Sequence, residues 1–216
     1  AVWSAARHGA GYVLVNPMHA AEPAPPLEPS PYLPSTRRFF DPLYLRIERI
    51  PEYAELPATE LGRLRLMHQE LGAGTGTATE VIDRDRVWTA KESALRTLYA
   101  AGRSAGRDIA FRAYCAVEGE GLLDFACWCA LTLALGADWR AWPEAYRDPH
   151  SPQVRRFRGE NAAEIDYFRW LQWCLDEQLR AAQTAARAAG MELGVMHDLA
   201  VGVNPAGADT WALGSA

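Results

Sequence analysis

Proline density constrains the fold of this chain more than any other feature. Eight of the 14 prolines fall between Pro17 and Pro42, and residues 28–42 read EPSPYLPSTRRFFDP. Each proline fixes its own φ, lacks a backbone N–H and biases the preceding residue toward extended geometry, so this segment can form neither a helix nor a central strand. We expect a stiff surface loop that is ordered before any ligand binds.

Two stretches that flank this loop have the composition of αβ units. The first runs from the helical residues AVWSAARH through Gly9 and Gly11 into the apolar run YVLVN. The second is a long amphipathic helix that stops at Gly190 and is followed by a short strand over residues 191–196. Helix, glycine, apolar strand and polar loop is the order typical of a parallel sheet, whose strands are buried on both faces.

Polar residues follow both predicted strands. Asn16 and His19 come after the first strand, and Asp198 comes after the second. In α/β barrels the active site lies at the carboxyl ends of the strands. We therefore expect these three side chains to face one functional edge.

About 120 residues between the two αβ units read mostly as helix. Residues 83–101 carry an apolar stripe, residues 111–136 read as two helices around Gly119 and Gly121, and residues 71–80 read as a flexible link. The predicted organisation is therefore a first unit over 1–50, a helical insertion over 51–160, and a helix, strand and loop over 161–216.

Composition and charge exclude several classes of partner. The net charge is −5 with no basic cluster, so we expect no nucleic-acid partner. No apolar run is long enough to cross a membrane, and the first residues lack both an initiator Met and the features of a signal peptide, so the chain reads as if it begins inside a longer sequence. The four cysteines form no C-x-x-C pair, which favours buried reduced thiols in a cytoplasmic protein without a metal site.

The side chains of the proline segment suit a sugar ligand. We expect seven of them to be exposed, namely Ser30, Tyr32, Ser35, Thr36, Arg37, Arg38 and Asp41. An aromatic ring can stack on the C–H face of a sugar, and hydroxyls supply directional hydrogen bonds. From composition alone, a rigid cover that touches no ligand remains the alternative.

The run NPMHAAEPAPPLEPSPYLPSTRRFFDPLYLRIE resembles the N-terminal part of the 4-α-glucanotransferases. These enzymes are also called amylomaltases or disproportionating enzymes, and they form glycoside hydrolase family 77 in the α-amylase clan. Ser30, Pro31 and Tyr32 match the family's Ser-Pro-Tyr, and residues 40–42 match its aromatic-Asn/Asp-Pro. The stretches IDRDRVWTAKESAL, YFRWLQWCLDEQL and GMELGVMHDLAVGVNPAGADTWA resemble the helical insertion, the helix before the third barrel strand, and that strand with its loop.

The resemblance implies a partial (β/α)8 barrel, an α/β fold of which this chain holds the first strands with a mostly helical insertion. It also implies retaining glycosyl transfer between maltooligosaccharides, with one carboxylate as nucleophile, a second as acid and base, and no cofactor. The family's nucleophile follows an Arg-x-Asp motif on the fourth strand, and its other carboxylates come later. No such motif occurs here, since Asp83 and Asp85 lie in the insertion. We therefore assign no catalytic residue and expect the isolated chain to be inactive.

Five residues are the candidates for substrate contact. They are Tyr32, Asp198, Ser30, Asn16 and His19. Tyr32 and Asp198 are chosen by family position, whereas Ser30 has a turn-forming role as its alternative and His19 a structural hydrogen-bonding role. Three readings of the whole chain stay open beside the transferase, namely a glucan-binding module without chemistry, an α-glucan hydrolase of the same clan, and a helical scaffold without a sugar function.

Overall fold

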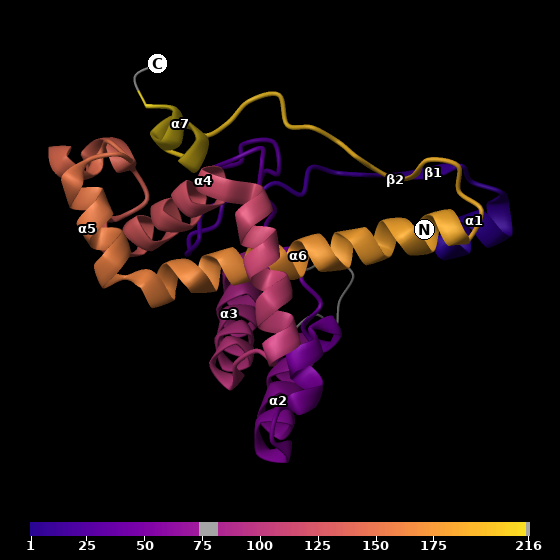
Figure 1. Ribbon diagram of the computed structural model, residues 1–216. Helices are drawn as coiled ribbons and strands as arrows, with labels where there is room; N and C mark the ends of the chain where they lie inside the picture. The colour runs from indigo at the N-terminus through magenta and orange to yellow at the C-terminus, as the bar shows by residue number, and fades with distance from the viewer. Residues whose placement is uncertain (74–81, 215–216) are drawn as a thin grey trace.

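A long helix, α6 (Ala162–Ala188), runs through the middle of the molecule (Figure 1). This computed structural model describes residues 1–73 and 82–214. The apolar stripe predicted for the helix is buried at Ile165, Phe168, Leu171 and Leu175. The helix ends as expected before Gly190, whose φ of 95° is left-handed and whose N–H bonds to the Arg187 carbonyl.

Each of the other long helices starts after a residue whose side chain caps it or next to a proline. They are α2 (Ala58–Ala73), α3 (Arg84–Ala101), α4 (Ala105–Leu135) and α5 (Pro152–Glu160). Asp83, Ser104 and Ser151 accept a hydrogen bond from the backbone N–H three residues on, which satisfies a free donor at the start of α3, α4 and α5. The link predicted over 71–80 is wrong for residues 71–73, which continue α2, and the rest of it lies outside the described residues.

Helix α4 is broken where the sequence predicted a break. Gly119 has φ 64° and ψ −145°, values that no helical residue takes, although α4 begins at Ala105 rather than at residue 111. The break frees the carbonyl of Glu118, which accepts a hydrogen bond of 2.8 Å from the Arg38 guanidinium. That guanidinium occupies the space that a Cβ on Gly121 would need. Both glycines therefore let the proline segment dock on α4.

Two short strands form the parallel pair that the αβ order predicted. Strand β1 (Tyr12–Val15) follows α1 (Val2–His8), and β2 (Gly194–His197) follows α6. The register pairs Tyr12 with Gly194 and Val15 with His197. Strand β2 starts three residues later than predicted, because Leu193 and Gly194 both direct their N–H groups at the Gly11 carbonyl.

The expectation that both faces of the strands are buried is wrong for this chain. Tyr12 is 50% exposed and Leu14 is 60% exposed. Helix α6 packs against β2, and Gln183 on that helix donates to the Leu193 carbonyl and accepts from the Val195 N–H. Within the described residues the sheet has two strands, so the side of β1 that carries Tyr12 and Leu14 meets solvent.

Two further glutamines of α6 bind the end of the proline segment and the chain that follows it. Gln172 is 2% exposed, donates to the Phe40 carbonyl at 2.8 Å and accepts from the Phe40 N–H at 3.0 Å. Gln178 makes the same two contacts with Arg46, both at 2.9 Å. Each side-chain amide thus forms the two backbone hydrogen bonds that a neighbouring strand would otherwise form with that residue.

The short 3-10 helix η1 (Pro42–Tyr44) begins at a partly buried carboxylate. Asp41 accepts a hydrogen bond of 2.8 Å from the Leu43 N–H. Lys91 on α3 donates to the Leu43 carbonyl and, at 2.9 Å, to the Leu45 carbonyl. Burial raises the pKa of Asp41 to about 6, which the Leu43 N–H and the Lys91 charge oppose.

Replacing Gln172 by Leu should destabilise the fold. The buried N–H and carbonyl of Phe40 would both lose their partner, at a cost of about 2–4 kcal/mol in the free energy of unfolding. Urea denaturation measures this loss. Gln178→Leu is the matched control, because Gln178 is half-exposed and water can replace its bonds, so its loss should stay below ~1 kcal/mol. Equal losses at the two positions would contradict the role given to Gln172.

The raised pKa of Asp41 predicts a pH dependence of stability. The unfolded carboxyl titrates near its ordinary value of 3.8 and the folded one at about 6, so the folded state binds the proton more tightly. Stability from this group is full below pH 4 and is lost as the pH rises to about 6, with a slope of at most about 1.4 kcal/mol per pH unit. Asp41→Asn should remove that slope in denaturation measured from pH 4 to pH 7, and an unchanged slope would exclude Asp41 as its source.

Candidate functional site

The proline segment is folded back on itself instead of extending into solvent. Ala20 N–H bonds to the Phe39 carbonyl at 2.9 Å, and Asp41 N–H bonds to the Met18 carbonyl at 2.9 Å. These bonds form an isolated antiparallel bridge between His19 and Phe40. The two ends of the segment therefore lie side by side, and the residues between them form a compact loop.

The expected exposure of the segment is wrong for two of its hydroxyl residues. Ser35 is 0% exposed and Thr36 is 1% exposed. The Ser35 carbonyl accepts from the N–H of Asp209, in the first turn of helix α7 (Ala208–Leu213), and a Cβ on Gly207 would lie 2.6 Å from that carbonyl oxygen. The loop after β2 thus packs over the middle of the proline segment, and these two hydroxyls face protein.

The carboxyl ends of β1 and β2 bring Tyr32 and Asp198 together. The Asp198 N–H bonds to the Val15 carbonyl at 3.0 Å, which continues the ladder by one residue. The Tyr32 hydroxyl then donates a hydrogen bond of 3.0 Å to Asp198 Oδ2, between residues 166 apart in sequence. This bond raises the pKa of Tyr32 above its ordinary value. The other Asp198 oxygen accepts from the Leu199 N–H at 2.9 Å, so the carboxylate is held at both oxygens.

Tyr32 keeps its ring accessible although its hydroxyl is bonded. The residue is 50% exposed, and its backbone N–H donates to the Ser30 hydroxyl at 3.3 Å. The Ser30 N–H in turn donates to Glu28 at 3.0 Å. Ser30 therefore forms the serine turn given as its alternative role, and that turn sets the direction of Tyr32.

The three remaining candidates line one cavity of about 170 Å³ beside this pair. Asn16, His19 and Ser30 contribute to its wall, together with Asp41 and several prolines. Pro31, which precedes Tyr32, also lines it. The five residues chosen from sequence thus gather at one edge of the molecule, three around the cavity and two as a bonded pair next to it.

His19 has an unusual environment within this cavity. Both of its ring nitrogens are buried without a hydrogen-bond partner in the structure. Burial, and then the positive charge of Arg37, lower the pKa of His19. The imidazole is therefore neutral at pH 7, with one nitrogen that can donate and one that can accept.

Two acidic residues between Pro17 and Pro42 are more buried than the sequence indicated. One Glu22 oxygen accepts from Asn204 at 2.8 Å and the other is buried without a partner. Asp41 was expected to be exposed and is partly buried. Asp41 lines the cavity and carries the raised pKa described above. The Asp-Pro pair at 41–42 signals a helix start, but no sequence signal points to the burial of Glu22.

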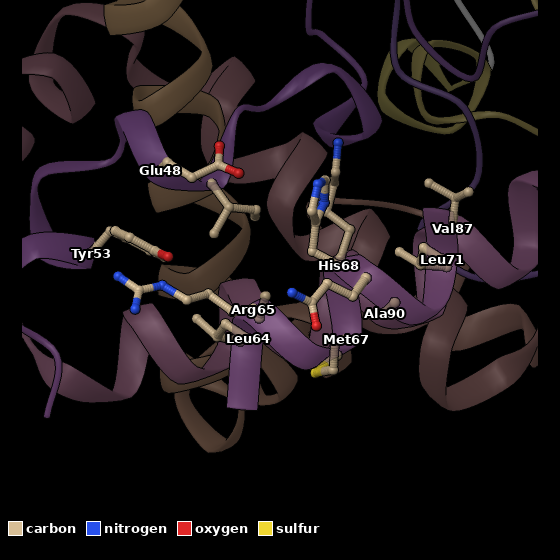
Figure 2. A pocket seen from close by; sticks show the side chains of 13 residues that line it. Glu48, Tyr53, Leu64, Arg65, Met67, His68, Leu71, Val87 and Ala90 are labelled. Carbon is tan, nitrogen blue, oxygen red and sulfur yellow. The ribbon is translucent and has the colours of Figure 1, made fainter. Parts of the chain in front are cut away.

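A separate apolar pocket lies away from this edge, among η2 (Ile47–Arg49), α2 and α3 (Figure 2). It has a volume of about 380 Å³, and Tyr53, Leu64, Met67 and Val87 contribute to its wall. No candidate chosen from sequence reaches it. Its wall also carries polar and charged side chains, among them Glu48, Arg65 and His68.

Within residues 1–73 and 82–214, no group of three or more His, Cys, Asp or Glu side chains is placed to hold a metal ion. In that same part of the chain, no helix combines the length and the apolar character needed to cross a membrane.

Comparison with known proteins covers the whole chain. The family model described as 4-alpha-glucanotransferase, of glycoside hydrolase family 77, matches residues 1–216. A 4-alpha-glucanotransferase of Mycobacterium tuberculosis (strain H37Rv) is 52% identical over 220 residues, which is 99% of this chain and 30% of that protein. The 4-alpha-glucanotransferase of Haemophilus influenzae is 30% identical over 223 residues, which is 95% of this chain and 32% of that protein.

Two solved structures of amylomaltases are also similar to this chain. The crystal structure of amylomaltase from Corynebacterium glutamicum is similar with a TM-score of 0.80 and 40% identity, over 97% of this chain and 28% of that one. Amylomaltase from Streptococcus agalactiae in complex with acarbose has a TM-score of 0.74 at 13% identity, over 93% of this chain and 38% of that one, and shows the shared fold. The chain spans about 30% of the length of the curated relatives it matches. It belongs to the 4-alpha-glucanotransferase family.

Proposed function

We propose that this chain is part of a 4-α-glucanotransferase that moves α-1,4-linked glucose units between maltooligosaccharides. The observation that carries the proposal is the hydrogen bond between Tyr32 and Asp198 at the carboxyl ends of two parallel strands. It joins the two best candidates for substrate contact and leaves the Tyr32 ring open to solvent. The family match over residues 1–216 supports it.

In this proposal the residues at the edge bind and orient sugar. The Tyr32 ring stacks on the C–H face of a glucose unit, and Asp198 fixes the angle of that ring. His19, with two unpartnered nitrogens, exchanges hydrogen bonds with sugar hydroxyls, as do Asn16 and Ser30 in the cavity wall. No metal or organic cofactor takes part in this binding.

The chemistry itself is proposed to lie outside these 216 residues. Retaining glycosyl transfer needs a carboxylate nucleophile and a second carboxyl, about 5–5.5 Å apart on opposite sides of the scissile bond. The Asp198 carboxylate is already held by Tyr32 and Leu199, which suits a positioning role and not a nucleophile. We propose that the remaining strands of a (β/α)8 barrel supply the pair and cover Tyr12 and Leu14. The four buried free thiols favour a cytoplasmic protein.

The first test compares the activity of the 216-residue chain with that of the full-length protein. Full-length protein incubated with maltotriose should give glucose together with longer oligomers, since the glycosyl-enzyme passes its sugar to another glucan. The 216-residue chain alone should give neither, because it lacks the carboxylate pair. Product analysis by chromatography measures this. Transfer by the isolated chain would contradict the placement of the catalytic groups, and release of glucose without longer products by the full-length protein would make it a hydrolase.

A second test concerns the aromatic ring. Tyr32→Ala in the full-length protein should lower kcat/KM for maltotriose about tenfold or more, equivalent to ~1.4 kcal/mol of transition-state binding. Tyr32→Phe is the comparison variant, since it keeps the ring but loses the bond to Asp198; it should lose at least about fivefold, or ~1 kcal/mol, and less than Tyr32→Ala. An unchanged kcat/KM for Tyr32→Ala, in a variant with the parent melting temperature, would show that the ring does not contact substrate.

A further inference from the structure

A second polar cavity, of about 500 Å³, opens between α4 and α6 on the helical part of the chain. It shares no lining residue with the sugar-binding edge. Three arginines line it, namely Arg103, Arg112 and Arg169, against two carboxylates, Asp108 and Asp166. The charged groups of the wall therefore carry one excess positive charge.

The two carboxylates are occupied by partners other than Arg169. Asp166 accepts from Arg103 at 3.1 Å and from the Tyr99 hydroxyl at 2.9 Å. Asp108 pairs with Arg112 at 2.7 Å and with Arg103 at 3.4 Å. Arg169 approaches Asp166 no closer than 3.8 Å, which is too long for a hydrogen bond.

The other neighbours of Arg169 are uncharged, namely the Cys115 thiol, which hydrogen-bonds to it, and the Phe111 ring, 5.9 Å from its guanidinium carbon. The Arg169 Nε is buried without a hydrogen-bond partner. Burial raises the pKa of the Cys115 thiol, so it stays uncharged at pH 7. A partly buried guanidinium with an unpaired N–H is costly unless an acceptor completes its bonding.

Other partly buried arginines nearby hydrogen-bond to carboxylates, including Arg158, whose Nε is also without a partner but whose other nitrogens bond to Glu120 and Asp124. Arg96 makes a two-bond contact with Glu164, at 2.6 and 2.5 Å. Arg107 bonds to Glu52 at 3.0 Å and to Glu177 at 2.7 Å. Arg169 has only the 3.8 Å ion pair with Asp166 and no carboxylate within hydrogen-bond distance, although it borders a cavity of about 500 Å³.

We propose that this cavity binds a phosphate group, either as inorganic phosphate or as the phosphate of a small phosphorylated sugar. A tetrahedral oxyanion offers several acceptors at once, and the planar fork of arginine binds phosphate through two parallel N–H donors. Arg169 lines the cavity without a hydrogen-bonded carboxylate, and Arg112, at the rim with its side chain 78% exposed, can turn from Asp108 toward the anion. The proposal does not depend on the glucan chemistry.

The test is a titration of the full-length protein with inorganic phosphate, in which calorimetry measures the heat of binding. Sodium chloride is added to keep the ionic strength constant. Saturable binding with one site is expected, and Arg169→Gln should weaken it at least tenfold. Arg140→Gln is the matched control, because Arg140 is an exposed arginine paired with Asp138 away from the cavity. It should bind phosphate like the parent. A parallel titration with glucose 6-phosphate distinguishes the sources, since tighter binding there identifies a sugar phosphate.

Two further variants keep the result interpretable if Arg169→Gln folds poorly. Arg112→Gln changes a highly exposed side chain and should weaken phosphate binding severalfold without lowering the melting temperature. Arg169→Lys keeps the charge but loses the fork, so it should bind more weakly than the parent and more tightly than Arg169→Gln. Absence of saturable binding by the parent protein, or unchanged binding in both Arg112→Gln and Arg169→Lys, would overturn the proposal.

Discussion

The contact between Gln172 and Phe40 is the constraint on which the candidate site depends. A segment with eight prolines has few backbone donors, so it cannot be held by the ladder of a sheet. One primary amide from α6 satisfies both polar groups of Phe40, beside the point where the two ends of the segment pair. With those ends fixed to a buried helix, the position of Tyr32 follows from the turn at Ser30.

Helix α6 organises the molecule because it serves two parts of the chain at once. Its apolar stripe packs on α4, while its glutamines bind backbone that precedes the helical part and backbone that follows it. The strands β1 and β2 are joined in this way although about 180 residues separate them. The break at Gly119 adds a second attachment, since it frees the carbonyl that receives Arg38. In this mostly helical chain, the ends of two strands and one stiff loop therefore lie together at one edge.

Much of this arrangement was predictable from local sequence rules. Apolar spacing indicated α6, Gly190 indicated its end, and the order of helix, glycine and strand indicated a parallel pair. Burial was harder to predict, because it depends on partners distant in sequence. Ser35 is buried because residues 207–209 pack over it, and Tyr12 is half-exposed because the described chain covers one face of the sheet. The role of Gln172 was likewise invisible, since a glutamine on an apolar face carries no signal of its backbone partner.

Tyr32 and Asp198 are proposed to act as one unit toward substrate. A double-mutant cycle in the full-length protein tests it, using Tyr32→Phe, Asp198→Asn and the double variant with kcat/KM for maltotriose as the readout. If the hydrogen bond orients the ring, the second substitution should cost little once the first is made, giving a coupling of about 1 kcal/mol or more. Losses that add within ~0.3–0.5 kcal/mol would show two independent residues and contradict the account.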